Sequence, residues 1–390
     1  MPEAVVVAAC RTAIGTSFKG TLARTSAFDL AEAAVTEAVR RSGLPGEAYD
    51  DLILGESRYG GGDIARNVAV IAGLTSVPGA AVNRHCASGL STVSMAAAGI
   101  RAGMEDAVLA GGVQSTSTAP VMRRVDPATG EWEDPWDSPA HPSTPTAPNN
   151  DMSVAVGWNA ARIAGISRQE MDAWALRSHL RALAAIDEGL FTDEIVPVKA
   201  LLADGAYTTF EVDEHPRRGS TAEKLAGLKP LHPEIDGFTI TAGNSSGIND
   251  AASVLALTSD TLASREGLTP LATVRGWASV GVDPERTGLA PAGAVSKALR
   301  RSGLDVGAVD LFEINEAFAS VAVAATRELG VSEEIVNIHG SGCSLGHPIA
   351  ASGARMLTTL VHDLRRRGGG IGVAAMCAGG GQASAVVVEV

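Results

Sequence analysis

The residue best suited to covalent chemistry is Cys86, in the segment A-V-N-R-H-C-A-S-G that begins at Ala81. A short apolar approach and a polar turn run here into small and apolar residues at helical spacing, up to Gly103. Unpaired backbone N–H groups and the positive end of a helix dipole favour a thiolate, the nucleophilic form of cysteine. Cys86 is therefore the candidate nucleophile. The alternative interpretation is simple burial, because free cysteine is among the most buried residue types.

Three further segments contain residues that can assist a nucleophile. They are N-E-A-F from Asn315, G-S-G-C-S-L-G-H-P at 340–348 with His347, and C-A-G-G-G from Cys377. A lone histidine is usually structural, but pairing with two cysteines makes His347 a candidate base. Cys377 lies between an apolar run and three glycines, so we expect an exposed bend rather than a core position. Asn315 has an alternative role as a helix N-cap before Glu316.

Alternating strand and helix patterns surround these segments. Apolar runs predict buried strands at 4–10, 51–56, 80–82 and 107–110, and helical periodicity predicts helices at 28–42 and 64–74. The same alternation resumes after residue 271 and ends in a strand at 383–390. Such alternation is typical of a layered α/β sheet.

The middle of the chain departs from this rhythm. Residues 116–150 are dense in Pro, Asp, Ser and Thr and are too long for a simple connection, so we expect an inserted lid or an oligomer arm. Ser167 with Glu170 predicts a capping box that starts a long helix. The loop 241–249 is rich in small residues and is expected to lead into a helix near Asp250.

The end of the sequence resembles its beginning. D-L-I-L-G-E at 51–56 corresponds to D-L-F-E-I-N-E at 310–316, V-N-R-H at 82–85 to V-N-I-H at 336–339, and A-G-G-V-Q-S at 110–115 to A-G-G-G-Q-A-S at 378–384. Three collinear matches at nearly constant offset predict two similar halves that flank an insertion. Equivalent loops of such halves meet at one face, which brings together the turns at Cys86, Asn315, His347 and Gly379.

Composition restricts the class of protein. The 390 residues are 45% hydrophobic and 19% charged, which is normal for a globular enzyme. The four cysteines have no short spacing suited to metal ligation, so we expect neither a disulfide framework nor a metal site, and a reducing, cytoplasmic compartment. The net charge of −13 argues against nucleic acid or an anionic membrane as a partner. No apolar run reaches the length of about 18 residues that a membrane span requires.

In this order, the segments around Cys86, Asn315, His347 and Cys377 resemble those of the thiolase family, the acyl-CoA acetyltransferases. The resemblance covers essentially the whole chain, including T-A-G-N-S-S-G-I-N-D at 241–250. It implies a five-layered α-β-α-β-α fold of two similar halves with an inserted loop domain. The corresponding boundaries are 1–117 with about 250–267 for the N-terminal half, 118–249 for the insertion and 268–390 for the C-terminal half.

The resemblance also implies a reaction, the reversible Claisen condensation and thiolysis of 3-oxoacyl-CoA by acyl transfer. This chemistry needs a sulfur nucleophile, a base, a proton shuttle for the α-carbon and donors to two thioester oxygens. By resemblance, Cys86 carries the acyl group, His347 activates Cys86 and donates to an oxyanion, and Cys377 moves the α-proton. Asn315 orients a water that shares the first oxyanion hole with His347. The N–H groups of Gly379 and Cys86 form the second oxyanion hole, and glycine leaves room there for the acyl group.

Coenzyme A and acyl-CoA enter as substrates, and the resemblance implies no permanently bound cofactor. By position, Ser246 matches the family serine that contacts the pantetheine arm. Arg217 matches the arginine over the adenine, although it also suits a plain surface position. Met152 and Phe318 are expected to wall the acyl pocket, with ordinary core packing as the alternative. The proline-rich segment lacks the character of the family's tetramer-forming loops, so we expect a homodimer, or a dimer of dimers.

Several positions depart from the family pattern without removing a catalytic group. Gln114 lies near a position that is commonly glutamate in the family, and Asp151 lies where some short-chain members have histidine. His232 replaces a frequent aromatic residue, and Thr287 replaces a frequent methionine. These changes are expected to alter the acyl pocket and its lid.

Two other functions are weighed against the thiolase hypothesis. Decarboxylating condensing enzymes and hydroxymethylglutaryl-type synthases share the fold but use Cys-His-His or Cys-Glu-His sets, so Cys377 argues against them. A thiolase-like protein that only binds acyl-CoA is disfavoured because Cys86, His347 and Cys377 are all present.

Overall fold

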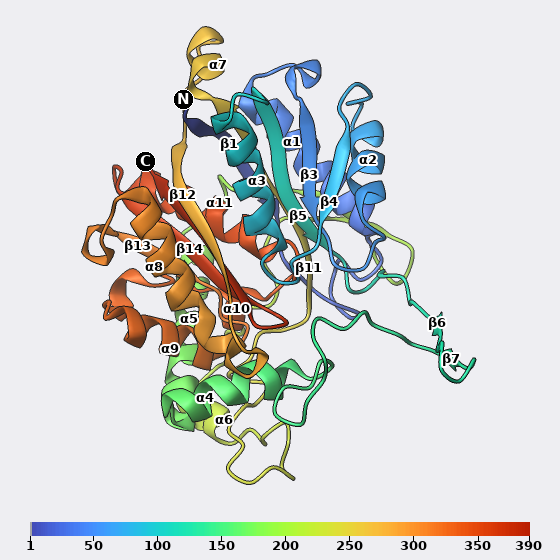
Figure 1. Ribbon diagram of the computed structural model, residues 1–390, viewed down its shortest axis with the longest axis vertical. Coiled ribbons are helices and arrows are strands. Elements are labelled where there is room, and N and C mark those ends of the chain that lie inside the picture. Colours follow the sequence, from blue (N-terminus) through green and yellow to red (C-terminus); the bar gives the residue numbers. More distant parts are fainter. Residues whose placement is uncertain (1) are drawn as a thin grey trace.

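The computed structural model describes residues 2–390, and its centre is a large mixed β-sheet (Figure 1). The strands follow the order β13-β14-β15-β12-β1-β11-β5-β3-β4. Their bounds are β1 Ala4–Thr12, β3 Asp51–Gly55, β4 Gly79–Val82, β5 Ala107–Gln114, β11 Asn249–Ser259, β12 Ala272–Gly281, β13 Leu311–Ile314, β14 Ile371–Ala378 and β15 Gln382–Glu389. Two short strands, β2 (Gly15–Thr16) and β8 (Ile195–Val196), pair beside this path with β11 and β1. The predicted α/β class is confirmed.

The order of the strands shows two similar halves. In one half β1, β11, β5 and β3 follow one another, with β3 parallel to β5 and β4. In the other half β12, β15, β14 and β13 follow one another, with β13 parallel to β14 and bridged in parallel to Val336. The repeated sequence D-L at 51–52 and 310–311 therefore lies at β3 and β13, which occupy equivalent places. β1 and β12 pair antiparallel, Val5 with Thr273 and Val6 with Ala272, and this pairing joins the halves.

Helices cover the sheet in layers (Figure 1). α1 (Ala27–Ser42) and α2 (Gly62–Ile71) pack on the first half, and α8 (Ala290–Ser302) and α9 (Ala319–Leu329) on the second. α3 (Ser88–Arg101) and α11 (Ser352–Arg366) lie between the halves and contact strands of both. Separate buried clusters fill the spaces between these layers. The layers follow the α-β-α-β-α order that the resemblance implies.

α3 and α11 approach closely because each has a glycine at the contact. A Cβ built on Gly89 would lie 2.6 Å from the backbone nitrogen of Ala354, and one on Gly353 would lie 2.5 Å from that of Leu90. This contact fixes the segment that follows Cys86 against the segment that follows His347, across the boundary between the halves.

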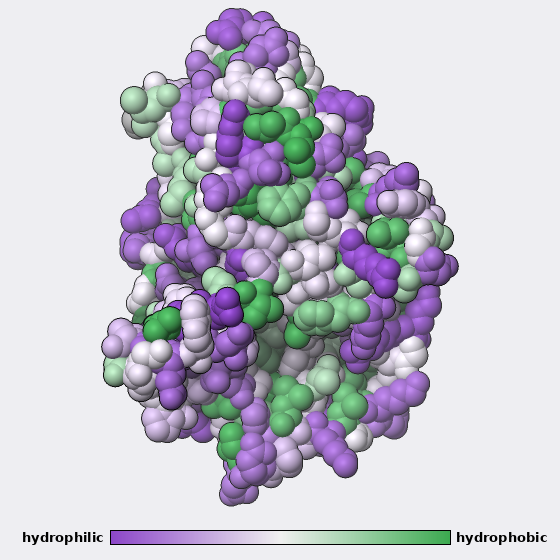
Figure 2. Space-filling model, turned by 90° about the vertical axis from the view of Figure 1, so that its right-hand side faces the viewer, coloured by the Kyte–Doolittle hydropathy of each residue, from purple (hydrophilic) through white to green (hydrophobic). Residues whose placement is uncertain are grey.

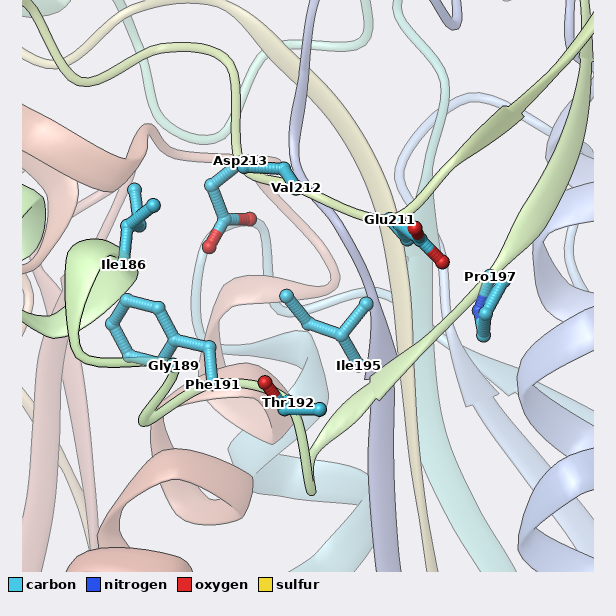
Figure 3. A pocket seen from close by; sticks show the side chains of 9 residues that line it. All are labelled: Ile186, Gly189, Phe191, Thr192, Ile195, Pro197, Glu211, Val212 and Asp213. Carbon is cyan, nitrogen blue, oxygen red and sulfur yellow. The ribbon is translucent and has the colours of Figure 1, made fainter.

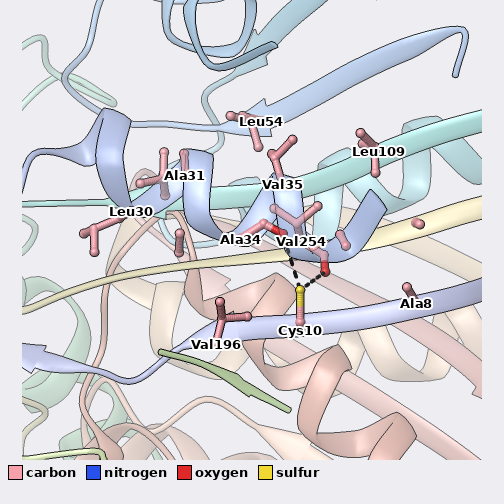
Figure 4. Close-up of a cluster of buried hydrophobic side chains, with 14 of the residues drawn as sticks. Ala8, Cys10, Leu30, Ala31, Ala34, Val35, Leu54, Leu109, Val196 and Val254 are labelled. Atoms are coloured by element: carbon pink, nitrogen blue, oxygen red, sulfur yellow. Dashed lines mark hydrogen bonds between the residues drawn. The ribbon is translucent and has the colours of Figure 1, made fainter. Parts of the chain in front are cut away.

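Cys10 belongs to the core of the first half (Figure 4). Its Sγ lies 3.4 Å from the carbonyl oxygen of Ala34 and 3.8 Å from that of Val254, so the single S–H hydrogen has two possible acceptors. Burial raises the pKa of the Cys10 thiol to about 12. Cys343 is also buried. These two cysteines are packing residues, which leaves Cys86 and Cys377 for chemistry.

Residues 249–259 form strand β11, so the prediction of a helix starting near Asp250 is wrong. The run A-A-S-V-L-A-L is short and apolar, and such a run fits a buried strand as well as a helix segment. In the structure this segment lies between β1 and β5 in the sheet, and all of its residues are buried. Its position in the sheet therefore makes it a strand rather than a helix. Asp250 accepts hydrogen bonds from the Ser17 hydroxyl at 2.6 Å and the Thr116 N–H at 2.7 Å, which ties the start of the insertion to the sheet.

The insertion begins with the predicted excursion. A small ribbon of β6 (Arg124–Val125) and β7 (Trp132–Glu133) projects from the body as an arm (Figure 1). The predicted capping box of Ser167 and Glu170 starts α5 (Arg168–Asp187). Other elements are a π-helical turn Ser153–Trp158, α4 Asn159–Ala164, β9 Val198–Leu201, β10 Tyr207–Phe210, α6 Ala222–Ala226, α7 Asp260–Arg265 and α10 Gly342–Leu345. Short 3-10 helical turns occur at Gly46–Ala48, Pro284–Leu289, Val306–Ala308 and Glu333–Ile335. Within residues 2–390, no helix has the length and apolar character needed to cross a membrane.

Candidate active site

Cys86 lies in the turn between β4 and α3, two residues before the first helical residue, Ser88, and so close to the helix start as predicted. Ser88 holds this turn, because its hydroxyl donates to the His85 carbonyl at 2.7 Å and accepts from the Arg84 N–H at 2.9 Å. His85 has a φ of 46°, a conformation that histidine adopts more readily than most residues. The Cys86 side chain is half-buried.

The surroundings of the Cys86 sulfur oppose its ionisation. Burial raises the pKa of the Cys86 thiol to about 11, although the backbone N–H groups of Gly379 and of Cys86 itself hydrogen-bond to the sulfur and act in the other direction. The expected N–H groups are therefore present and lower the pKa of the thiol as predicted, but the loss of solvation is the larger effect, so the thiol and not the thiolate is the favoured form. Cys86 is a thiol at neutral pH, and its attack requires a base.

Cys377 lies within β14 and pairs with Ala383 of β15. The expectation of an exposed bend is wrong, because the strand continues through Ala378 and only 2% of Cys377 is exposed. Burial raises the pKa of the Cys377 thiol, and the neighbouring Cys86 adds to the effect. The two sulfurs therefore share one site. The side chains packed around Cys377 are those of Ala155, Val156 and Val321, with Met152 and Phe318 beside them.

Gly379 lies next to Cys86, because its backbone N–H hydrogen-bonds to the Cys86 sulfur. A Cβ built on Gly379 would lie 3.8 Å from the Met152 sulfur and 3.8 Å from Cγ of His85, which are ordinary contact distances. The space above Gly379 is thus bounded by the Met152 side chain and the His85 ring. We refer to it as the acyl chamber.

The backbone and ring of His347 are both held by hydrogen bonds. Its N–H donates to Oδ1 of Asn249 at 3.0 Å, and Nδ2 of Asn249 donates to the Gly15 carbonyl at 3.0 Å. The Ser352 hydroxyl lies 2.6 Å from Nδ1 of His347 and donates to the Pro348 carbonyl at 2.9 Å. Because the one hydroxyl hydrogen points to Pro348, Ser352 accepts from Nδ1–H. This tautomer leaves the lone pair on Nε2.

His347 is a neutral imidazole near pH 7. Burial, with a smaller contribution from the positive charge of Arg355, lowers the pKa of His347 to about 4. A neutral ring with its lone pair on Nε2 is in the protonation state that a general base needs.

Asn315 directly follows β13 and faces the His347 ring. Its Nδ2 lies 3.5 Å from both ring nitrogens. The alternative role as a helix N-cap is wrong, because α9 begins at Ala319 and Phe318 is the residue before it. Oδ1 of Asn315 is buried without a hydrogen-bond partner among residues 2–390. A buried acceptor of this kind is suited to holding a water or a donor on a ligand.

Neighbouring strands bring the two groups of side chains to one end of the sheet. β13, which Asn315 follows, is parallel to β14, which carries Cys377 near its end. The structure thus brings Cys86 together with Cys377 and Gly379, and it brings His347 together with Asn315, the residue that follows the adjacent strand.

Arg217 lines a cavity that the loop after Ser246 also borders. Ser246 is fixed by its N–H, which donates to the Ala317 carbonyl at 2.9 Å. Arg217 is exposed, and its backbone N–H donates to Nδ1 of the buried His179 at 3.2 Å. The cavity, of about 420 Å³, is lined by Thr16, Ser17, Phe18, Lys19, Glu214, His215, Pro216, Arg217, Gly247 and Ile248. Figure 2 shows a side of the molecule that is hollowed near its middle, with apolar side chains at the edge of the hollow.

A second cavity, of about 270 Å³, lies where the insertion packs on β1 (Figure 3). Asp213 in its wall forms a buried ion pair with Arg11 at 2.8 Å, and Arg11 also pairs with Glu194 at 2.6 Å. None of the candidate site residues lines this cavity, so it belongs to the packing of the insertion. Its lining residues are Ile186, Gly189, Phe191, Thr192, Ile195, Pro197, Glu211, Val212 and Asp213.

Two of the positions that depart from the family pattern are in contact. Nε2 of His232 lies 2.7 Å from Oδ2 of Asp151, and its Nδ1 lies 2.7 Å from Oε1 of Glu234. The hydrogen bond to Glu234, with the charge of Asp151, raises the pKa of His232. Thr287 accepts the N–H of Gly381 at 3.0 Å, in the turn that follows Cys377. These residues therefore act on the borders of the chamber rather than on the sulfurs.

Ser352 and Asn249, which hold the ring and backbone of His347, are not predicted by the sequence motifs. The only signal was positional, since Ser352 begins the helix after the G-H-P turn and Asn249 begins β11. No cluster of three or more His, Cys, Asp or Glu residues capable of holding a metal ion occurs among residues 2–390.

The chain matches two family models and many curated relatives. Residues 4–261 match the N-terminal domain of thiolase, and residues 268–390 match its C-terminal domain. An acetyl-CoA acetyltransferase of Escherichia coli (strain K12) is 40% identical over 100% of this chain and 99% of its own. A β-ketoadipyl-CoA thiolase of Pseudomonas aeruginosa is 42% identical over 99% of each chain.

Solved structures agree with these matches. Bacillus anthracis acetyl-CoA acetyltransferase superposes with a TM-score of 0.88 at 38% identity, and human mitochondrial 3-ketoacyl-CoA thiolase with 0.90 at 34% identity. Each comparison covers 100% of this chain and 99% of the other. The chain therefore belongs to the thiolase family, as the order of its motifs implied.

Proposed function

We propose that the protein is an acyl-CoA:acetyl-CoA C-acyltransferase, which cleaves 3-oxoacyl-CoA with CoA and catalyses the reverse Claisen condensation. The observation that carries this proposal is that two thiols, Cys86 and Cys377, lie together beside the N–H of Gly379. A neutral histidine, His347, lies beside Asn315, the residue that follows the adjacent strand β13. The names of its relatives, which include acetyl-CoA acetyltransferase and 3-ketoacyl-CoA thiolase, support the same reaction.

The first half-reaction forms an acyl-enzyme. Nε2 of His347 takes the proton of the Cys86 thiol as the sulfur attacks the 3-keto carbon. The bond between the α- and β-carbons then breaks, and its electron pair passes to the α-carbon of the departing acetyl-CoA. Cys377 supplies the proton that converts this enolate into acetyl-CoA. The products are acetyl-CoA and an acyl group on Cys86.

The second half-reaction returns the enzyme to its starting state. The thiol of a new CoA loses its proton to the Cys377 thiolate and attacks the acyl carbonyl, and the Cys86 sulfur leaves and regains a proton from His347. Oxyanions form in both halves. We assign the thioester enolate oxygen to Nε2 of His347 and a water held by Asn315, and the acyl oxyanion to the N–H groups of Cys86 and Gly379.

CoA is the substrate that brings acyl groups in and out, and no permanently bound cofactor takes part in these steps. We assign the pantetheine arm to the loop of Ser246 and the adenine end to Arg217, which share the border of the 420 Å³ cavity with Lys19. Met152 and Phe318, packed beside Cys377, are assigned to the acyl chamber wall. The cationic side chains at the cavity suit a phosphorylated ligand in a protein that is otherwise acidic.

The deciding experiment is thiolysis of acetoacetyl-CoA by CoA, followed through loss of the 3-oxoacyl-CoA absorbance. Turnover that depends on CoA separates an active acyltransferase from a protein that only binds acyl-CoA. Binding of acyl-CoA without any cleavage would instead support the second class.

Assembly, domains and compartment are further parts of the proposal. β4 ends the sheet and presents its free edge, so we assign it to the contact of a homodimer, with the arm available for a dimer of dimers. The residues 1–117 with 250–267, 118–249 and 268–390 are proposed as first half, insertion and second half. The cysteines are free, in keeping with a cytoplasmic enzyme.

Replacing Ser352 by alanine is expected to lower kcat about tenfold or more while KM changes little. The change removes the acceptor that fixes the Nδ1–H tautomer, so Nε2 is less often free to take the Cys86 proton. Steady-state thiolysis across pH 6 to about 9 checks this. Ser352→Thr keeps the hydroxyl and should recover most of kcat, whereas equal losses in both variants would mean that Ser352 only supports packing.

Replacing Gly379 by alanine is expected to leave folding intact and to lower kcat/KM about tenfold for acyl groups larger than acetyl. The new methyl group meets no described atom closer than 3.8 Å but occupies the acyl chamber. Gly381 is the matched control, since its φ of 74° and a Cβ only 2.2 Å from the Val282 carbonyl make alanine destabilising there. Thermal melting and chain-length kinetics separate the two effects. Loss of folded protein in Gly379→Ala would contradict the assignment.

A further inference from the structure

A carboxylate that the reaction steps above do not use holds one wall of the acyl chamber. Asp151 directly precedes Met152, whose sulfur lies 3.8 Å from a Cβ built on Gly379. Oδ1 of Asp151 accepts the N–H of Ser153 at 3.0 Å and its hydroxyl at 2.6 Å. The Asp151 carboxylate therefore fixes the start of the π-helical turn, and with it the position of Met152.

The later residues of this turn are fixed in the core. The Ser320 hydroxyl donates to the Gly157 carbonyl at 2.8 Å. Residues 155–157 are buried, whereas residues 151–154 are only partly buried. The first residues of the segment, Met152 among them, are therefore the part of the wall that has room to move.

A single imidazole joins Asp151 to a second carboxylate. Nε2 of His232 lies 2.7 Å from Oδ2 of Asp151, and Nδ1 of His232 lies 2.7 Å from Oε1 of Glu234. The His232 ring packs edge-on against the buried Phe238, with 5.0 Å between the ring centroids. Phe238 in turn packs on Trp158 at the far end of the π-helical turn. We refer to Asp151, His232 and Glu234 as the histidine bridge.

We propose that the histidine bridge determines which acyl groups the enzyme accepts, by holding Met152 at the chamber while His232 is protonated. When His232 loses its proton, the contact with Asp151 weakens, Met152 moves outward and the chamber admits longer acyl groups. His232 and Asp151 are thus specificity-determining residues that act through Met152. The inference rests on the proposed function and adds the residues that select the acyl group.

The proton on His232 allows one ring to join two carboxylates. A protonated imidazole donates from both nitrogens, whereas the neutral ring has one N–H and turns a lone pair toward the other carboxylate. The hydrogen bond to Glu234 raises the pKa of His232 most, burial opposes it, and the charge of Asp151 adds to the rise. Within residues 2–390, Asp151 and Glu234 are the charged groups that act on His232, and Phe238 beside it is uncharged. The bridge is therefore complete below the pKa of His232 and is lost as the pH rises through it.

His85 also borders the chamber, but it titrates in a different range. Burial, and then the neighbouring His141, lower the pKa of His85, whereas the pKa of His232 is raised. A change in selectivity on the alkaline side of the ordinary histidine pKa of about 6.5 therefore belongs to His232.

The test measures kcat/KM for acetoacetyl-CoA and for 3-oxohexanoyl-CoA over a pH range that spans the titration of His232. The ratio of the two values cancels the titration of groups that act on both substrates alike, such as His347. For the native chain we expect the ratio of the longer to the shorter substrate to rise about tenfold with increasing pH, since an apolar pocket discriminates between methylene groups on this scale.

Two variants connect this pH dependence to the bridge. His232→Phe keeps a ring against Phe238 but has no N–H, so its ratio should be high at every pH. Glu234→Gln keeps an acceptor but removes a negative charge, so the rise should occur at lower pH than in the native chain. His362→Phe is the control, because His362 bonds to the Ala9 carbonyl of β1, and it should leave the rise unchanged.

A native ratio that stays constant with pH, or a ratio in His232→Phe equal to that of the native chain at acidic pH, would overturn the inference and leave the proposed function in place. If His232→Phe does not fold, the native pH profile and its displacement in Glu234→Gln still decide the matter. Failure of the native chain to cleave either substrate at any pH would overturn the proposed function, and the inference with it.

Discussion

Cys86→Ser is expected to abolish thiolysis, with kcat reduced by about 10⁴-fold or more, while the fold is kept. A serine hydroxyl ionises far less readily than a thiol, so proton transfer to the same His347 produces the nucleophilic anion much less often. The oxygen also fits the space of the sulfur in the turn before α3. Thiolysis kinetics and thermal melting of the purified variant check both parts of the expectation.

Cys10→Ser is the matched control for this substitution. Its Sγ lies within hydrogen-bond distance of two backbone carbonyls in the core, and a hydroxyl can donate its one hydrogen to either of them. The control should retain turnover even if its melting temperature falls. Activity in Cys86→Ser close to that of the native chain would reject Cys86 as the acyl carrier.

Cys377→Ala is expected to lose carbon–carbon cleavage and condensation but still to accept an acyl group on Cys86. Cys377 moves the α-proton in the proposed steps, whereas acyl transfer from a simple thioester needs only the nucleophile, its base and the N–H donors. We expect kcat for thiolysis to fall by about 10²- to 10⁴-fold, the usual contribution of a positioned acid or base. Incubation with acetyl-CoA followed by mass spectrometry of the intact protein should show the added acetyl group.

The double variant Cys86→Ser with Cys377→Ala provides the control for that mass measurement. It should carry no acetyl group, because the receiving sulfur is absent. An acetyl group that persists in the double variant, or native thiolysis in Cys377→Ala, would contradict the division of roles between the two sulfurs.

Much of the site could be predicted from sequence because its parts lie in short, unusual segments. The turn that presents Cys86, the G-H-P loop of His347 and the glycines after Cys377 all have compositions that few core elements share. The three short repeats also predicted two similar halves, and the equivalent places of β3 and β13 agree with them. A short sequence pattern therefore predicts a site residue well when the local backbone conformation itself forms part of the site.

The errors arose where tertiary position decided the outcome. Cys377 was placed in a bend because glycines follow it, yet the ladder with β15 extends past it and buries it. Asp250 was placed before a helix because an apolar run without clear period fits both helix and strand, and only the neighbours β1 and β5 resolve it. The pKa of Cys86 depends on how completely the folded chain shields the sulfur from water. A sequence pattern that predicts the start of a helix does not give the extent of this burial.

The pairing of β1 with β12 has a consequence for how substrates come and go. Backbone hydrogen bonds make the two halves a single continuous ladder, so they do not swing apart as hinged lobes do. The strands of the arm pair only with each other, and that leaves the arm free of this ladder. Entry and exit of CoA therefore depend on displacement of loops, on the roughly nanosecond to microsecond scale typical of such segments, and not on slower opening of whole domains.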